Sequence, residues 1–178
     1  MLISNHILIM SNLMTKTNDN SALKSLDNEF LLKKTLGMFS TGITIVTTTD
    51  ENNKPIGMTV NSFASVSLNP ALVLWSIDKK QPSYDIFLNA TGYAVNVLNK
   101  NQKKLCTKFA SPVEDKFKNV NWEMSENGNP LIIGSLAWFD CIKWNYYDGG
   151  DHQILVGEVK SYDLNENDPL LYWNGKIS

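Results

Sequence analysis

The sequence contains no arginine, only two histidines and only two cysteines in 178 residues. All sixteen basic residues are lysines, so any bound phosphate must be held without the planar two-pronged contact that arginine provides. His6 lies close to the N-terminus, which leaves His152 as the one imidazole of the folded region and excludes histidine-rich metal sites. Cys106 and Cys141 lack metal-ligand spacing, and we interpret them as free thiols of a reducing compartment. We therefore expect no metal site and a cytoplasmic location.

Several common functional motifs are also absent. No Gly-x-Gly-x-x-Gly follows a strand, and the chain has no Walker-type loop, no His-Glu-x-x-His and no Gly-x-Ser-x-Gly. A net charge of −2 and a pI near 5.7 give no reason to expect nucleic acid or an anionic membrane as partner. Residues 1–10 are apolar, but they are too short to span a bilayer and lack the basic region of a secretory signal.

The remaining composition is that of one globular domain. Hydrophobic residues make up 43% and charged residues 19% of the chain, which is long enough to bury a sizeable core. Residues 11–26 are polar, and we expect residues 1–26 to form a mobile tail that is dispensable up to residue 24. We place the folded domain at residues 27–178.

Periodic patterns within this domain predict a mainly β fold. Asp27 is expected to cap a helix whose apolar residues share one face: Phe30, Leu31, Leu32, Leu36 and Phe39. Runs of strand length and composition lie at 43–49, 56–63, 71–77, 93–98, 136–147 and 153–164. Further helices are expected at 83–88 and 102–109, and the paired glycines at 149–150 predict a hairpin. Because strands and helices do not alternate regularly, an antiparallel barrel with peripheral helices fits better than a parallel sheet.

The stretch Gly57–Pro70, GMTVNSFASVSLNP, runs from a strand into a loop and is dense in hydroxyl and amide side chains. A site that binds a polar, phosphorylated cofactor through backbone N–H groups and neutral side chains needs such a mixture. Strand alternation places Thr59 and Asn61 on one face and Val60 and Ser62 on the other. A turn stabilised by asparagine and serine side chains is the equally weighted alternative.

Two other polar groups are candidate ligand contacts. Thr47 and Thr48 end a strand with hydroxyls available to a ligand, although β-propensity alone explains them. Lys79 or Lys80, followed by Ser83 at the start of a short helix, would suit a phosphate. Two adjacent lysines on a solvated surface are the plainer interpretation of the same residues.

His152 follows the glycine turn, where a side chain can be presented over a cleft. The plainer interpretation is a structural hydrogen-bonding histidine at the start of a strand. Asp151 either orients its imidazole or serves only the turn.

Five segments, in order, resemble the short-chain NAD(P)H:flavin oxidoreductases, the reductase components of two-component flavin monooxygenases. They are TGITIVTT at 41–48, the Gly57–Pro70 stretch, YAVNVL at 93–98, GDHQILVGEV at 150–159 and PLLY at 169–172. The resemblance covers about residues 30–175. It implies an FMN-binding split β-barrel that uses NADH or NADPH to reduce FMN or FAD. It also implies a homodimer, with reduced flavin passing to a separate monooxygenase.

The resemblance also assigns site residues. The flavin ring and ribityl chain would contact Thr59, Val60, Asn61 and Ser62, with Phe109, Ala110 and Ser111 along the ring. The phosphate would lie near Ser65, Val66 and Ser67, completed by Lys79 and Ser83, and Thr47 and Thr48 would lie close by. His152 would position the nicotinamide, because hydride passes directly from nicotinamide C4 to flavin N5 without obligatory acid–base chemistry.

Three alternatives remain open. A split-barrel oxidase of the pyridoxamine-phosphate type would need a basic phosphate site, which a chain without arginine makes harder to build. A non-catalytic flavin-binding protein is favoured by the C-terminus, which carries Ile177 where the family commonly has an aromatic residue. A haem-binding split barrel would show a Soret band.

Overall fold

The computed structural model describes residues 28–178. The expected tail at residues 1–26 and the expected helix cap Asp27 therefore lie outside the described residues. Within residues 28–178, no helix is long and apolar enough to cross a bilayer.

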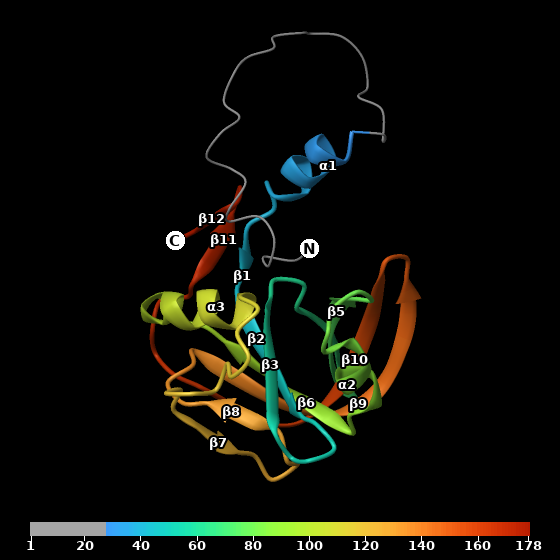
Figure 1. Cartoon of the computed structure of the whole chain (residues 1–178), viewed down its shortest axis with the longest axis vertical. Coiled ribbons are helices and arrows are strands. Elements are labelled where there is room, and N and C mark those ends of the chain that lie inside the picture. Colours follow the sequence, from blue (N-terminus) through green and yellow to red (C-terminus); the bar gives the residue numbers. More distant parts are fainter. Residues whose placement is uncertain (1–27) are drawn as a thin grey trace, which may run out of the picture.

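The centre of the fold is a seven-stranded antiparallel sheet that curls on itself (Figure 1), in the order β3-β2-β6-β9-β10-β5-β4. A β-branched run forms the inner strand β2, and the glycine turn closes the long β9–β10 hairpin as the sequence predicts. The strands are β2 (Thr44–Thr49), β3 (Pro55–Val60), β4 (Ala64–Leu68), β5 (Ala71–Asp78), β6 (Gly92–Val97), β9 (Ala137–Gly149) and β10 (His152–Leu164).

Short elements surround this sheet. Two small sheets are formed by β1 (Thr41–Gly42), β11 (Leu171–Trp173) and β12 (Lys176–Ile177), and by β7 (Trp122–Met124) with β8 (Pro130–Ile132). The helices are α1 (Glu29–Leu36), α2 (Tyr84–Asn89), the 3-10 turn η2 (Lys100–Gln102) and α3 (Lys103–Ala110). The mainly β, antiparallel architecture expected from the sequence is thus confirmed.

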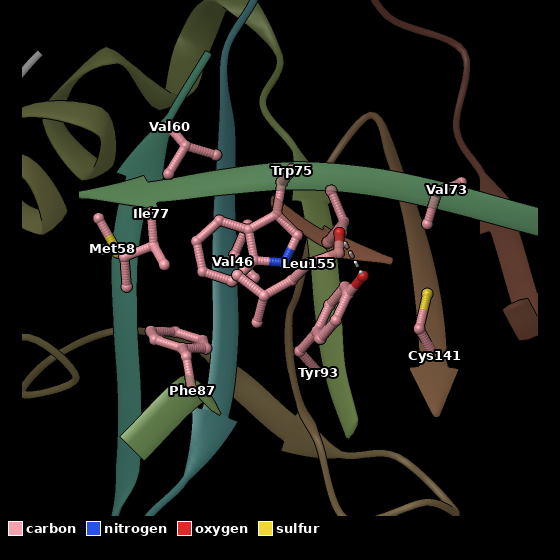
Figure 2. Packing of buried hydrophobic residues seen from close by; sticks show 11 residues of the cluster. Val46, Met58, Val60, Val73, Trp75, Ile77, Phe87, Tyr93, Cys141 and Leu155 are labelled. Carbon is pink, nitrogen blue, oxygen red and sulfur yellow. Dashed lines mark hydrogen bonds between the residues drawn. The ribbon is translucent and has the colours of Figure 1, made fainter. Parts of the chain in front are cut away.

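The inner face of the barrel holds one apolar core. Trp75 on β5 is fully buried and meets Phe87 of α2 and Tyr93 of β6 edge-on, with ring centroids 4.9 and 5.7 Å apart. Figure 2 shows Val46 and Leu155 packed beside them. This core fixes α2 against the barrel and so fixes the loop before α2.

The other face of β2 supports a second core beneath α3. Alternation along β2 turns Ile43 and Ile45 away from Val46, and they pack with Cys106 and Phe109 of α3. The Thr59 hydroxyl donates to the Cys106 carbonyl oxygen at 2.8 Å, which ties α3 to β3. The C-terminal end of α3 is thereby held against β3.

The first helix differs from the expectation in its cap. Asn28, one residue after Asp27, is the N-cap, and its side chain accepts from the Leu31 N–H at 2.9 Å. No residue of α1 is buried, and Phe30 and Phe39 are 62% and 77% exposed. Figure 1 shows α1 apart from the main sheet, beside β1, β11 and β12. Its apolar face has no cover within the described chain.

The second difference concerns the expected loop within Gly57–Pro70. The residues after Phe63 form β4, an edge strand that pairs with β5 through a register shift between Ser65 and Ser67. Alternating serines and apolar residues pair well with a neighbouring strand, so the long-range partner β5 decides this structure rather than the local turn chemistry.

Candidate functional site

A cavity of about 700 Å³ opens between β3, the start of α2 and the C-terminal end of α3. It is lined by three separate parts of the chain: residues 54–59, residues 78, 80–83 and 86, and residues 109–116. Five of the predicted site residues line it: Thr59, Ser83, Phe109, Ala110 and Ser111. Lys80, the alternative to Lys79 in the expected phosphate contact, lines it as well.

A second cavity, of about 660 Å³, lies on the other side of α2 and shares Ile86 with the first. Its wall carries Asp50, Glu51 and Asp85 but no lysine, and Thr48 is the one predicted site residue in it. A wall with only negative charges disfavours a phosphorylated ligand. The wall of the first cavity carries lysines at 54, 80 and 116, which offset Asp78, Glu114 and Asp115, so this cavity is the better candidate.

The wall formed by Phe109 depends on a glycine. A Cβ added to Gly57 would lie 2.6 Å from Phe109 Cε1 and 3.3 Å from Phe117 Cε2. The phenyl ring therefore packs directly on the β3 backbone, and it meets Phe117 edge-on at 5.0 Å between centroids. This packing brings the end of α3 to the cavity as a rigid wall.

Lys116 adds a half-buried cation to this wall. Its Nζ donates to the carbonyl oxygens of Phe109 at 2.9 Å and Gly57 at 3.3 Å. Burial lowers the pKa of this ammonium from its usual value of 10.5. Lysines at 54 and 80 line the same cavity but are exposed.

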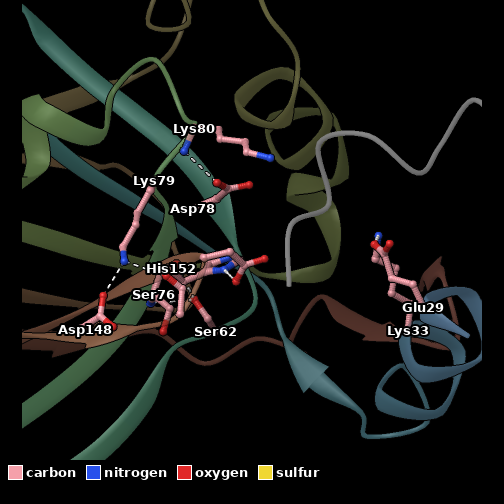
Figure 3. A network of polar contacts seen from close by, with 11 residues as sticks. Glu29, Lys33, Ser62, Ser76, Asp78, Lys79, Lys80, Asp148 and His152 are labelled. Carbon is pink, nitrogen blue, oxygen red and sulfur yellow. Dashed lines mark hydrogen bonds and ion pairs between the residues drawn. The ribbon is translucent and has the colours of Figure 1, made fainter. Parts of the chain in front are cut away.

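Beyond Thr59, the polar residues at the end of β3 meet the ends of β5 and β10. The Ser62 hydroxyl donates to the Ser76 carbonyl oxygen at 3.1 Å and accepts from the Ser76 N–H at 3.0 Å. In the antiparallel pairing of β10 with β5, His152 lies opposite Asp78, which also lines the cavity. Figure 3 shows His152, Ser62 and Ser76 side by side. The predicted Asn61, Ser62 and His152 thus lie at strand ends next to residues of the cavity wall, although they do not line the cavity themselves.

Two buried polar atoms in this region have no hydrogen-bond partner within residues 28–178, the Oδ1 of Asn61 and the Nε2 of His152. The other ring nitrogen of His152, Nδ1, lies 2.7 Å from Asp151 Oδ1. If the carboxylate accepts the Nδ1 proton, a neutral imidazole presents a lone pair at Nε2. An unsatisfied buried polar atom costs about 1–3 kcal/mol, so a ligand that pairs with both atoms would recover that cost.

Lys79 lies at the hairpin rather than in the cavity wall. Its Nζ pairs with the Asp148 carboxylate and donates to the Gly150 carbonyl oxygen at 2.7 Å, while its backbone N–H donates to the Asp151 carbonyl oxygen at 3.0 Å. These contacts join the end of β5 to the turn that precedes His152 (Figure 3). Asp148 correspondingly has a lowered pKa, because Lys79 donates to its carboxylate.

Two predicted threonines have hydroxyls engaged within the protein. The Thr47 hydroxyl donates to the Pro130 carbonyl oxygen at 2.5 Å, and the Thr48 hydroxyl donates to the Gly92 carbonyl oxygen at 2.9 Å. Val60 is buried in the barrel core, and its carbonyl oxygen accepts from Thr44 at 3.3 Å. A ligand role for these three residues stays a prediction.

Ser65, Val66 and Ser67 lie on β4, outside the cavity wall of a single chain. Ser65 pairs with Val73, midway along β5, and the Ser67 hydroxyl accepts from the Asn69 N–H at 3.2 Å. These three residues therefore do not line the cavity, and their expected contact with a phosphate also stays a prediction.

The serines of the cavity wall differ in what they can offer. Ser83 precedes α2 and makes no capping bond, and its hydroxyl contacts only the Met58 sulfur, at 3.9 Å. The Ser111 hydroxyl donates to the Thr107 carbonyl oxygen at 2.7 Å. The Ser83 hydroxyl thus donates only to a weak sulfur acceptor, which a ligand oxygen could replace, whereas Ser111 offers the cavity an acceptor and its backbone.

Sequence reasoning missed Met58, Gln81 and Lys116 as cavity residues. Lys116 stands in a polar loop, where a lysine is indistinguishable from a solvated surface residue. The one sequence feature that could have pointed to Lys116 is its place just before Phe117, an aromatic residue whose ring packs on Phe109.

The two thiols are free and buried, as expected. Burial raises the pKa of Cys106 to about 11 and that of Cys141 to about 12, so both stay protonated at neutral pH. Neither thiol is a nucleophile of the site.

Comparisons with known proteins agree with this geometry. Residues 36–178 match the family described as a flavin reductase like domain. The chain is 43% identical to the FMN reductase (NADH) SmoA of Agrobacterium fabrum over 84% of each protein. It is 44% identical to the reductase component of the flavin-dependent trigonelline monooxygenase of Acinetobacter baylyi, over 81% of this chain. The chain spans 46% of the length of that relative.

Solved structures give the same result. The NADH:FAD oxidoreductase SgcE6 of Streptomyces globisporus superposes with a TM-score of 0.83 at 36% identity, over 89% of this chain and 96% of that one. The flavin reductase PheA2 superposes with a TM-score of 0.79 at 39% identity, over 85% and 97%. These similarities confirm the expected split β-barrel. The chain belongs to the flavin reductase-like domain family.

Proposed function

We propose that this protein is a flavin reductase that oxidises NADH or NADPH and reduces FMN or FAD. The reaction balances as NADH, a proton and oxidised flavin giving NAD⁺ and reduced flavin. The main support is the cavity between β3 and α3, together with the buried Asn61 Oδ1 and His152 Nε2, which have no partner within residues 28–178. Asn61 follows Thr59 of the cavity wall by two residues, and His152 lies opposite Asp78 of that wall in the β5–β10 pairing. Relatives named for NADH-dependent reduction of FMN and of FAD support the same reaction.

The residues of the cavity suit the two ligands in different ways. Asn61 Oδ1 is an acceptor and can pair with an N–H of the flavin pyrimidine edge. His152 Nε2, as an acceptor, can pair with the carboxamide N–H of nicotinamide. When bound, the flavin accepts hydride from the nicotinamide. The protein then contributes alignment of two rings and exclusion of water, which supply much of the rate.

We further propose that reduced flavin leaves for a separate monooxygenase. The trigonelline relative and the HsaB proteins of Rhodococcus and Mycobacterium are named as reductase components or subunits of flavin-dependent monooxygenases. Residues 28–178 form one barrel domain, so an oxygenating site would belong to another protein or to another part of a longer chain.

A homodimer is also proposed, on the basis of exposed apolar side chains. Phe39 on the segment after α1 and Leu68 on β4 are 77% and 95% exposed. Trp144, Tyr146 and Tyr147 on β9 are about half exposed, and this part of β9 extends past its partner β6. Aromatic side chains exposed at neighbouring positions of one strand, as on β9, are typical of an association surface. Sedimentation should give twice the chain mass, and a monomer at micromolar concentration would contradict the proposal.

We infer a cytoplasmic location from the buried free thiols and from the use of NADH or NADPH, whose intracellular pools would supply the hydride.

A steady-state assay tests the reductase proposal against the non-catalytic alternative. Purified protein with NADH or NADPH should consume the pyridine nucleotide only when FMN or FAD is added. Flavin fluorescence quenching without any consumption of pyridine nucleotide would instead identify a flavin-binding protein.

A further inference from the structure

Residues 61–63 connect the two edges of the main sheet. Strand β3 ends at Val60 and β4 begins at Ala64, and these are the first and last strands in the sheet order. The two edges do not pair with each other within residues 28–178. Phe63 anchors one end of the connection, because its ring stacks on Phe139 of β9 with 5.5 Å between centroids. The contacts of these three residues therefore decide how the two edges meet.

The Ser62 hydroxyl bonds to both backbone groups of one residue of β5. It donates to the Ser76 carbonyl oxygen at 3.1 Å and accepts from the Ser76 N–H at 3.0 Å. The pairing of β4 with β5 stops where Ala64 lies opposite Leu74, and the same register, continued, would place Ser62 opposite Ser76. The serine side chain thus makes the pair of hydrogen bonds that its backbone would make in a longer edge strand.

This clasp between Ser62 and Ser76 connects the two candidate ligand contacts. Asn61, whose buried Oδ1 has no partner within residues 28–178, directly precedes Ser62. Ser76 lies opposite Ile154 of β10, which follows His152 by two residues. Figure 3 shows His152 beside Ser62 and Ser76. The clasp therefore fixes the group proposed to bind the flavin relative to the group proposed to bind the nicotinamide.

We propose that Ser62 is a positioning residue for hydride transfer, and that its bonds to Ser76 set the spacing between Asn61 and His152. The proposal rests on the proposed function. It differs from the expectation that the Ser62 hydroxyl contacts the flavin, because its one proton is already donated to Ser76. Hydride transfer tolerates little misalignment, since a displacement of about 1 Å can cost about 100-fold in rate.

The test separates flavin binding from hydride transfer. Ser62→Ala removes both bonds of the clasp. The limiting rate of flavin reduction, at saturating FMN and pyridine nucleotide, should fall about tenfold. FMN affinity, measured by fluorescence quenching, should change less than about threefold. Ser62→Thr keeps the hydroxyl and should restore most of the rate.

Ser135→Ala is the matched control. It also removes a serine hydroxyl that donates to a backbone carbonyl oxygen, that of Ile132 at 2.9 Å, but Ser135 is outside the cavity wall. Its limiting rate should equal that of the wild type. Equal slowing in Ser135→Ala and Ser62→Ala would overturn the proposal, because lost stability would then explain both.

A wild-type limiting rate in Ser62→Ala would also overturn the proposal. So would a tenfold loss of FMN affinity at an unchanged limiting rate, which would make Ser62 a direct flavin contact. If Ser62→Ala does not fold, Ser62→Cys takes its place with the same outcomes, because a thiol is of similar size but a weak donor and acceptor. A wild-type protein that reduces no flavin would contradict the proposed function. Fast wild-type reduction that Ser62→Ala matches would contradict only the positioning role.

Discussion

Asp151 and His152 are adjacent in sequence and also bonded through their side chains, with Asp151 Oδ1 2.7 Å from His152 Nδ1. The hydrogen bond to His152 lowers the pKa of the Asp151 carboxyl. The pair fixes the ring, whose other nitrogen, Nε2, is buried and has no partner within residues 28–178. A turn residue thus orients the one histidine of the described chain.

His152→Ala should lower the rate of flavin reduction or raise the KM for pyridine nucleotide about tenfold, with flavin affinity nearly unchanged. The reason is that hydride transfer depends on alignment of the two rings. Stopped-flow reduction at several NADH and NADPH concentrations separates the two effects. Wild-type kinetics in this variant would make His152 a structural residue.

Asp148→Asn should loosen the turn before His152, because it removes the partner of Lys79. Amide exchange at residues 149–152 should speed up, while Asp168→Asn, which breaks the similar exposed pair with Lys100, should leave these amides unchanged. The pKa of Asp148 is lowered, so the pair persists as pH falls through the ordinary carboxyl range and is lost only at lower pH. Unaltered exchange in Asp148→Asn would show that backbone pairing alone holds the turn.

Asn61→Ala should weaken flavin binding by about 1–3 kcal/mol, the scale for losing a buried polar partner. The motivation is the buried Asn61 Oδ1, which lacks a partner in the described chain. Asn121→Ala, at an exposed position away from the cavity, is the control. Fluorescence titration with FMN measures both, and equal affinities would remove Asn61 from the site.

Gly57→Ala should destabilise the fold by about 1–3 kcal/mol, because its Cβ would overlap the buried Phe109 ring. Gly42→Ala is the matched control, since no atom lies within 4 Å of the added Cβ. Urea denaturation gives both free energies of unfolding. Equal values for the two variants would show that the ring moves aside at little cost.

The sequence predicts the parts of this fold that depend on local patterns. The run at 43–49 and the glycine pair at 149–150 correspond to β2 and to the β9–β10 turn, because β-branched residues and glycine act through the local backbone. Strand β4 was missed because its structure comes from pairing with β5. The short strands β1 and β11 were missed for the same reason, since Thr41 pairs with Tyr172 across most of the chain.

In the candidate site, too, some features follow from the local sequence and others only from contacts between distant residues. Its glycine- and serine-rich segments are visible in sequence, and Phe109 and Ser83 do meet in one cavity. Which hydroxyls remain free is decided by distant backbone groups, such as the Pro130 carbonyl that engages Thr47. The sequence does not single out Lys116 for a related reason. Its burial in the cavity wall and the absence, among residues 28–178, of a carboxylate beside its ammonium depend on the folded structure.

The proposed function requires that this cavity align a pyridine nucleotide with a flavin for hydride transfer. The direct measurement is anaerobic rapid mixing of the protein and FMN with NADH, or in a parallel run with NADPH, followed at the visible absorbance of oxidised flavin. We expect bleaching that saturates with pyridine nucleotide, greatly exceeds the protein-free rate and slows about tenfold in His152→Ala. Bleaching no faster than in the protein-free mixture would contradict it.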